Sequence, residues 1–105
     1  MADEHQPPID RIVLLDEKDG SDTRHFEAEI GDSGNLMLEG QDLGPKVRRF
    51  FHTDEYEYFY AIPAAYKDTM LLKLLKEKLD DGTLLDNWLK QHGIPHEFHN
   101  QYSPD

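Results

Sequence analysis

The chain has 105 residues, which suits a single domain with its own apolar core. Its 22 acidic and 11 basic residues give a formal net charge of −11, and this negative field repels phosphate groups and anionic lipids, which argues against nucleic-acid and membrane partners. Cysteine is absent, so the composition excludes disulfides and thiolate metal sites.

Both ends of the chain lack periodic apolar residues. We predict a disordered tail over residues 1–8, which are polar and rich in proline, one domain over residues 9–99 and a frayed tail over residues 100–105. The first residues have neither the basic nor the apolar region of a signal peptide. No apolar run reaches the roughly 20 residues of a membrane span, so we expect a cytoplasmic protein.

The first strand is predicted over residues 10–16, where β-branched and other apolar residues follow one another. Its side chains alternate between the two sides of the sheet, so Ile12 and Leu14 point to one side. Val13 and Leu15 point to the other side. The parity of the strand does not decide which of the two pairs faces the core.

Two further strands and a short helix follow. Residues 23–30 alternate between apolar and polar side chains, which is typical of a strand that is solvated on one side. A glycine-containing turn then leads into a strand over residues 35–39. Apolar residues at helical spacing from Leu43 to Phe51, with Pro45 in the first turn, predict the helix.

The strand after this helix carries the clearest signal in the chain. Residues 55–62 alternate at period two, and Tyr56, Tyr58 and Tyr60 fall on one side. Aromatic residues favour strands, and Pro63 ends this one. We expect the tyrosine side to pack beneath the helices, with the hydroxyl groups at its polar edges.

Two helices and a last strand complete the predicted fold. A leucine stripe predicts a helix that ends near Leu79, and a second stripe with Trp88 predicts a helix that Gly93 ends. Residues 94–99 are predicted to be an edge strand, because Pro95 cannot donate a ladder hydrogen bond. The order is strand, strand, strand, helix, strand, helix, helix, strand. It predicts an α+β fold with one mostly antiparallel sheet and helices packed on one face.

The side of the sheet opposite the tyrosines is the candidate interaction face. Alternation places Phe59 and Met37 on it, and they give it a small apolar centre. The glutamates around that centre are Glu27, Glu29, Glu39, Glu55 and Glu57. An apolar patch with a polar rim is typical of a protein contact, although one of the tails could instead fold over it.

A glycine-rich segment before the short helix is predicted to be a structural turn. Gly40 and Gly44 supply the backbone freedom for a sharp reversal. Asp42 is placed to bond to backbone amides or to cap the helix. Alternatively, a pocket at this turn would use Gln41 and Asp42 to hold a small molecule.

The sequence offers no convincing catalytic set. Its three serines lie in predicted turns or in the tail, away from any strand-turn-helix elbow that activates a hydroxyl group. His92, His96 and His99 do not share a face under the predicted elements, which leaves only a pair of Glu97 with His99 open. We therefore expect no enzymatic activity, no metal site and no cofactor.

Three segments stand out together: Leu38–Gly44 with its Gly-Gln-Asp-Leu-Gly sequence, Asp54–Pro63 with its Glu-Tyr-Glu-Tyr sequence, and Trp88–Pro95. In these segments the chain resembles a family of small uncharacterised bacterial domains, and the likeness extends over roughly residues 35–99. The resemblance implies a bacterial source and a stand-alone cytoplasmic domain. It carries over no catalytic residue.

These observations lead to three hypotheses about function. The first is an acidic protein-interaction domain without catalytic activity, whose charge favours a basic protein partner and which could be inhibitor-like or immunity-like. The second is a small-molecule-binding domain or minor enzyme with a pocket at the Gly40–Gly44 segment. The third is a homodimeric structural module that pairs through the candidate interaction face.

Overall fold

The structure is a computed structural model that describes residues 6–99 and contains two compact units. The first unit is residues 9–72 and holds the whole sheet. The second unit combines residues 6–8 with residues 73–99. Among the residues that the structure describes, no helix has both the length and the apolar character of a membrane span. The predicted tails lie partly or wholly outside the described residues, and the single domain over residues 9–99 stays a prediction.

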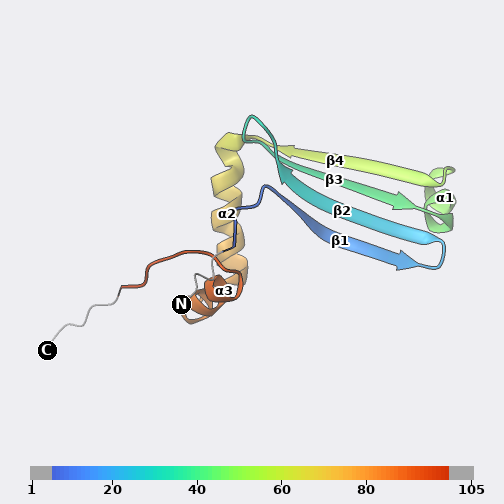
Figure 1. Cartoon of the computed structure of the whole chain (residues 1–105). Coiled ribbons are helices and arrows are strands. Elements are labelled where there is room, and N and C mark those ends of the chain that lie inside the picture. Colours follow the sequence, from blue (N-terminus) through green and yellow to red (C-terminus); the bar gives the residue numbers. More distant parts are fainter. Residues whose placement is uncertain (1–5, 100–105) are drawn as a thin grey trace, which may run out of the picture. The chain divides into compact units, whose positions relative to one another are not determined.

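The first unit is built on a four-stranded antiparallel sheet in which neighbours along the chain are also neighbours in space (Figure 1). Its strands are β1 (Arg11–Asp19), β2 (Asp22–Ile30), β3 (Leu36–Leu43) and β4 (Glu55–Ile62). Helix α1 (Pro45–Phe51) connects β3 to β4 and contacts β2, β3 and β4. The α+β fold and the antiparallel sheet predicted from alternating side chains are confirmed.

Helix α2 (Ala64–Lys78) begins directly after β4, and the turn between β2 and β3 holds its first residues. The side-chain Oδ1 of Asn35 accepts a hydrogen bond from the Ala64 amide at 2.9 Å. Lys67 Nζ donates to the carbonyl oxygen of Gly34, also at 2.9 Å. The amides of a first helical turn have no partner within the helix, so Asn35 acts as a cap from a distant part of the chain.

The second unit contains α3 (Gly82–Gln91), which follows α2 after a short break. Asp81 caps this helix, because its Oδ1 accepts a hydrogen bond from the Thr83 amide at 3.0 Å. Gly93 follows the last turn with a φ of 66°, a left-handed conformation that glycine adopts without strain. The predicted end of the helix is therefore correct.

The strand predicted over residues 94–99 is wrong, because that segment contains no strand. The side chain of His96 bonds within the second unit instead. His96 Nδ1 lies 2.8 Å from the Ile94 carbonyl oxygen, and His96 Nε2 lies 3.1 Å from Asp86 Oδ1 on α3. Pro95 also removes one ladder donor, so the segment has little to gain from pairing with a sheet edge.

The register of β1 shows which of its side chains lie on each face of the sheet. Ile12 and Leu15 lie opposite β2 residues of the inner face, which is the side of the sheet that carries the β4 tyrosines. Val13 lies opposite a residue of the other side, the outer face. The register shifts at Leu14, where a β-bulge inserts one extra residue. Neither alternating pair predicted from parity is therefore correct.

The apolar core of the first unit is small. Among the described residues of the whole chain, Val47 on α1 is the one apolar side chain that is buried, with 8% of its surface exposed. Tyr58 is half-buried, whereas Tyr60 is 58% exposed. Within the first unit, apolar side chains are exposed on both faces of the sheet. The expectation that the tyrosine side packs beneath the helices stays a prediction.

The turn predicted at Gly40–Gly44 is wrong for most of its length. Gly40 and Asp42 lie inside β3, and Gly40 is opposite Tyr58 on β4. A Cβ atom at Gly40 would overlap Cζ of Tyr58, so the glycine makes room for the tyrosine ring rather than for a reversal. Within the segment, only Gly44 has a positive φ, of 119°, at the start of α1.

The cap of α1 is also different from the prediction. Asp22 Oδ1 accepts a hydrogen bond from the Lys46 amide at 2.9 Å, although Asp22 lies 24 residues earlier in the chain. Asp42 instead places Oδ1 3.6 Å from Nε of Arg24. The side-chain bond to the first turn of the helix therefore comes from the start of β2 and not from Asp42.

Replacing Gly40 with Ala is expected to destabilise the sheet by about 1–3 kcal/mol, the usual cost of forcing extra atoms into a packed contact. The added methyl group would displace the Tyr58 ring. Gly31→Ala is the matched control, since its Cβ would meet no atom closer than 3.8 Å. Urea unfolding of the two variants measures the difference. Equal stabilities would contradict the packing of Tyr58 on Gly40.

Candidate protein-interaction face

The outer face is defined by residues that lie opposite one another in the register. Glu39 on β3 lies opposite Glu27 on β2 and Phe59 on β4. Met37, two residues before Glu39, lies opposite Glu29. The structure thus brings the seven residues predicted for this face to one side of the sheet: Met37, Phe59, Glu27, Glu29, Glu39, Glu55 and Glu57.

The apolar residues of the outer face lie on β3 and on the edge strand β4, and they are open to solvent. Phe59 is 64% exposed and Met37 is 39% exposed. A hollow of about 290 Å³ lies beside them, and the other side chains that line it include Glu27, Glu29 and Glu39. An aromatic ring that remains this exposed next to carboxylates is an accessible apolar contact for another molecule.

Glu27 differs from the other glutamates of the outer face because it is buried. Its side chain is 7% exposed and bonds to Arg11 on β1 and to His25 Nε2, the latter at 2.7 Å. The Arg11 bond and then the His25 bond lower the pKa of Glu27 from 4.5 to about 2. Glu27 therefore ties β1 to β2, and its burial does not favour the partner-binding role that parity predicts for it.

Glu55 and Glu57 lie close together at one end of the outer face. Gln41 Nε2 donates to Glu55 Oε2 at 2.8 Å and to Glu57 Oε2 at 3.3 Å. The neighbouring Glu55 raises the pKa of Glu57, through a hydrogen bond between the carboxyl groups and through charge repulsion. Neither carboxylate has an ion-pair partner among residues 6–99. A cation placed beside them would stabilise both charges.

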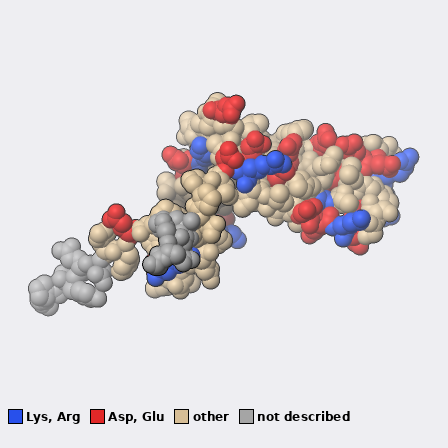
Figure 2. Space-filling model, in the orientation of Figure 1, with Lys and Arg blue, Asp and Glu red and all other residues tan. Residues whose placement is uncertain are grey.

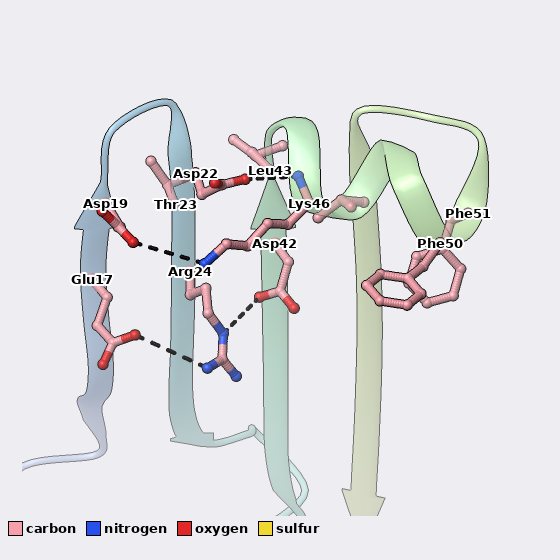
Figure 3. Close-up of a pocket in the computed structure, with 11 residues that line it drawn as sticks. Glu17, Asp19, Asp22, Thr23, Arg24, Asp42, Leu43, Lys46, Phe50 and Phe51 are labelled. Atoms are coloured by element: carbon pink, nitrogen blue, oxygen red, sulfur yellow. Dashed lines mark hydrogen bonds and ion pairs between the residues drawn. The ribbon is translucent and has the colours of Figure 1, made fainter.

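A second hollow, the end cavity, lies between α1 and the end of the sheet and has a volume of about 300 Å³ (Figure 3). Arg24 reaches across it from β2. Its guanidinium group is 4.0 Å from Glu17 Oε1 and 3.6 Å from Asp42 Oδ1. Phe50 and Phe51 on α1 form an apolar wall at one side (Figure 3).

The end cavity contains only part of the small-molecule pocket predicted at this segment. Asp42 lines it, and its Oδ1 atom is buried with no hydrogen-bond partner among the described residues. Gln41, the other predicted contact, lies on the outer face. No hydrogen bond joins Asp42 to a tyrosine hydroxyl within residues 6–99. Arg24 and Lys46 form ion pairs with three of the four carboxylates that line the cavity, so few of its charges are left for a ligand.

Among the described residues, metal-ligating side chains form groups of two at most. Within residues 6–99 there is no group of three or more histidine, aspartate or glutamate side chains that could hold a metal ion. The pair left open by the sequence is present, with His99 Nε2 2.9 Å from Glu97 Oε1. Both side chains are exposed, and two ligands fall short of the four that a structural zinc site uses.

No protein-family model, curated protein or solved structure matches the chain. The resemblance to small bacterial domains therefore stays a prediction. The outer face is identified by its register, its exposed apolar residues and its charge alone.

The stability of the first unit is expected to depend on pH through Glu27 and His25. The pKa of Glu27 is about 2 in the fold against 4.5 ordinarily, so its contribution is present above about pH 4.5 and is lost as the pH falls toward 2. The hydrogen bond to Glu27 is the largest cause of a raised pKa at His25; burial opposes it and Asp16 adds to it. The contribution of His25 is therefore full below pH 6.5 and is lost as the pH rises through the raised pKa.

Urea unfolding of the wild type and Glu27→Gln across pH 2–9 measures this contribution. The difference in stability between them should be largest between about pH 4.5 and 6.5 and should shrink on both sides. His25→Asn is the control, because it should remove the alkaline change and keep the acidic one. A difference that does not vary with pH would show that Glu27 is not ionised and paired as described.

Proposed function

We propose that this chain is an acidic protein-interaction domain without catalytic activity and that its outer face binds a basic protein. The observation that carries the proposal is the exposure of Phe59, at 64%, on a face that also carries four exposed glutamates, Glu29, Glu39, Glu55 and Glu57. A large exposed aromatic residue costs free energy in water, and a partner that covers it recovers that free energy.

The charge of the outer face indicates the chemistry of the partner. Glu29, Glu39, Glu55 and Glu57 form no ion pair among residues 6–99. The repulsion that raises the pKa of Glu57 would be relieved by a lysine or arginine side chain. A partner that presents an apolar residue between basic residues therefore fits this face best, and complementary charge would also speed its association.

An inhibitor-like or immunity-like role is one form of this function. An acidic face that covers the basic site of an enzyme or toxin would block it by occupancy alone and would require no catalytic residues. We further propose a cytoplasmic location and a bacterial source. The absence of cysteine supports the first, and the resemblance stated above supports the second.

Binding of a small molecule in the end cavity is the second candidate function. It is favoured by the cavity itself and by the buried Oδ1 of Asp42, which has no hydrogen-bond partner among residues 6–99. It is less well supported, because Arg24 and Lys46 already pair with the acidic groups of the cavity. Phe50 lines this cavity and is 74% exposed, so its replacement distinguishes the two candidates.

Phe59→Asp is expected to abolish capture of the basic partner from the native lysate and to weaken binding of the purified partner at least about 30-fold, the loss of a hot-spot residue. Phe50→Asp is the matched control. It makes the same change at a similarly exposed phenylalanine and should leave this binding intact. Binding is measured by titration calorimetry at two salt concentrations, and higher salt should weaken it.

Two results would contradict the proposal. One is capture that Phe59→Asp leaves unchanged. The other is loss of binding in Phe50→Asp alone, which would move the function to the end cavity.

A further inference from the structure

We propose that the basic partner of the outer face adds an extended segment to β4, so that this segment extends the four-stranded sheet by one more strand. The inference rests on the proposed function, because it takes the partner to be a basic protein. It adds how that partner is held, which is through the backbone of β4 as well as through Phe59.

β4 is one of the two edge strands of the sheet (Figure 1). It pairs with β3 on one side, and its other side, the free edge, has no neighbouring strand among residues 6–99. The register with β3 runs from Glu55 to Ile62 without a bulge. A regular edge strand presents backbone amide and carbonyl groups to which another strand can bond.

One backbone bond just before β4 shows which of its residues have free backbone groups. The Gly44 amide donates to the Asp54 carbonyl oxygen at 2.8 Å, and this pair continues the register of the two strands. Because bonded and non-bonded pairs alternate along an antiparallel ladder, Tyr56, Tyr58 and Tyr60 direct their backbone groups to β3. The residues between them direct theirs to the free edge: Glu55, Glu57, Phe59 and Ala61.

The residues with free backbone groups also carry the side chains of the outer face on β4. Within residues 6–99, no backbone bond outside the sheet involves Glu57, Phe59 or Ala61. An added strand would form hydrogen-bonded pairs with these residues, and its side chains opposite them would lie on the outer face. Backbone pairing and contact with Phe59 therefore come from one partner segment.

Charge specifies the sequence of the added segment. Charged side chains of both signs lie over the surface that the strands form (Figure 2). The charged residues of β4 itself are Glu55 and Glu57, which share the outer face with Phe59. A basic residue opposite each glutamate and an apolar residue opposite Phe59 are favourable cross-strand pairs. In the antiparallel direction, which is the more stable one, the segment reads apolar, any, basic, any, basic.

The other edge strand, β1, suits such a segment less well. The β-bulge at Leu14 interrupts its register, and bulges turn an edge away from further pairing. β1 also carries Arg11 and Lys18, which would lie beside a basic segment as like charges. β4 contains no bulge and no basic residue.

A second copy of this chain suits the free edge less well than a basic segment does. Pairing of β4 with the β4 strand of a copy would bring further glutamates to the same seam and would supply no basic side chain. Each copy also carries a net charge of −11, so the two chains repel each other.

Hydrogen exchange of single amides in the full-length chain, followed by NMR, tests the free edge. Relative to their intrinsic rates, the amides of Glu57 and Phe59 should exchange at least about tenfold faster than those of Tyr58 and Tyr60, which bond to β3. Slow exchange at every chain concentration would mean that the chain's own residues cover the edge. Protection that increases with chain concentration would mean that a second copy covers it. Each of these results, like equally fast exchange of all four amides, would overturn the proposal.

The probe for the partner segment is the synthetic peptide Ile-Thr-Leu-Thr-Lys-Thr-Lys, with both ends capped. In antiparallel register it places leucine opposite Phe59 and its lysines opposite Glu57 and Glu55. At about 1 mM it should slow the exchange of the Phe59 and Glu57 amides at least about tenfold and leave that of Tyr58 unchanged. No slowing would overturn strand addition, whereas capture of a basic protein that depends on Phe59 would still support the proposed function.

Methylation of single peptide nitrogens separates backbone pairing from side-chain contact. The leucine amide would point toward β4, and the amide of the threonine after it would point away. N-methylation of the leucine should weaken peptide binding at least about tenfold, while the same change at that threonine, the matched control, should leave binding intact. Equal effects of the two methyl groups would overturn strand addition. They would leave side-chain contact with the outer face, and with it the proposed function, uncontradicted.

Discussion

The packing of the Tyr58 ring across Gly40 is the contact on which the arrangement of the sheet depends. Phe26 stacks on the same ring from β2, with 5.9 Å between the centroids, so the contact joins three strands. A slip of one residue between β3 and β4 would place a side chain under the ring and would exchange the two faces of the sheet. The residue that lacks a side chain therefore favours the observed register, in which Tyr58 lies opposite Gly40.

Once the register is fixed, the two faces acquire different chemistry. The inner face carries a row of tyrosines with no charge at its centre, whereas the outer face carries Phe59 among carboxylates. Glu27 is the exception on the outer face, because Arg11 and His25 satisfy its charge and keep it buried. The difference in charge is the reason that a basic protein suits the outer face better than the inner face.

The alternation of side chains predicts most of this arrangement, as in residues 55–62, where it separates the tyrosines from Phe59 correctly. It fails where a contact is distant in the chain. The bulge at Leu14 shifts parity without any glycine or proline to signal it, and the cap from Asp22 crosses 24 residues. Glycine is common in turns, and only the position of the Tyr58 ring on the next strand shows that Gly40 belongs inside a strand.

The central claim is that the outer face binds a basic protein through Phe59, and hydroxyl-radical footprinting of the full chain tests it most directly. Oxidation of Phe59 and of Tyr60 is followed by mass spectrometry, with and without the basic protein captured from the lysate. At a fixed concentration of the chain, the account predicts that this protein protects Phe59 and Met37 more than Tyr60. Protection of Tyr60 with Phe59 still fully oxidised would contradict it.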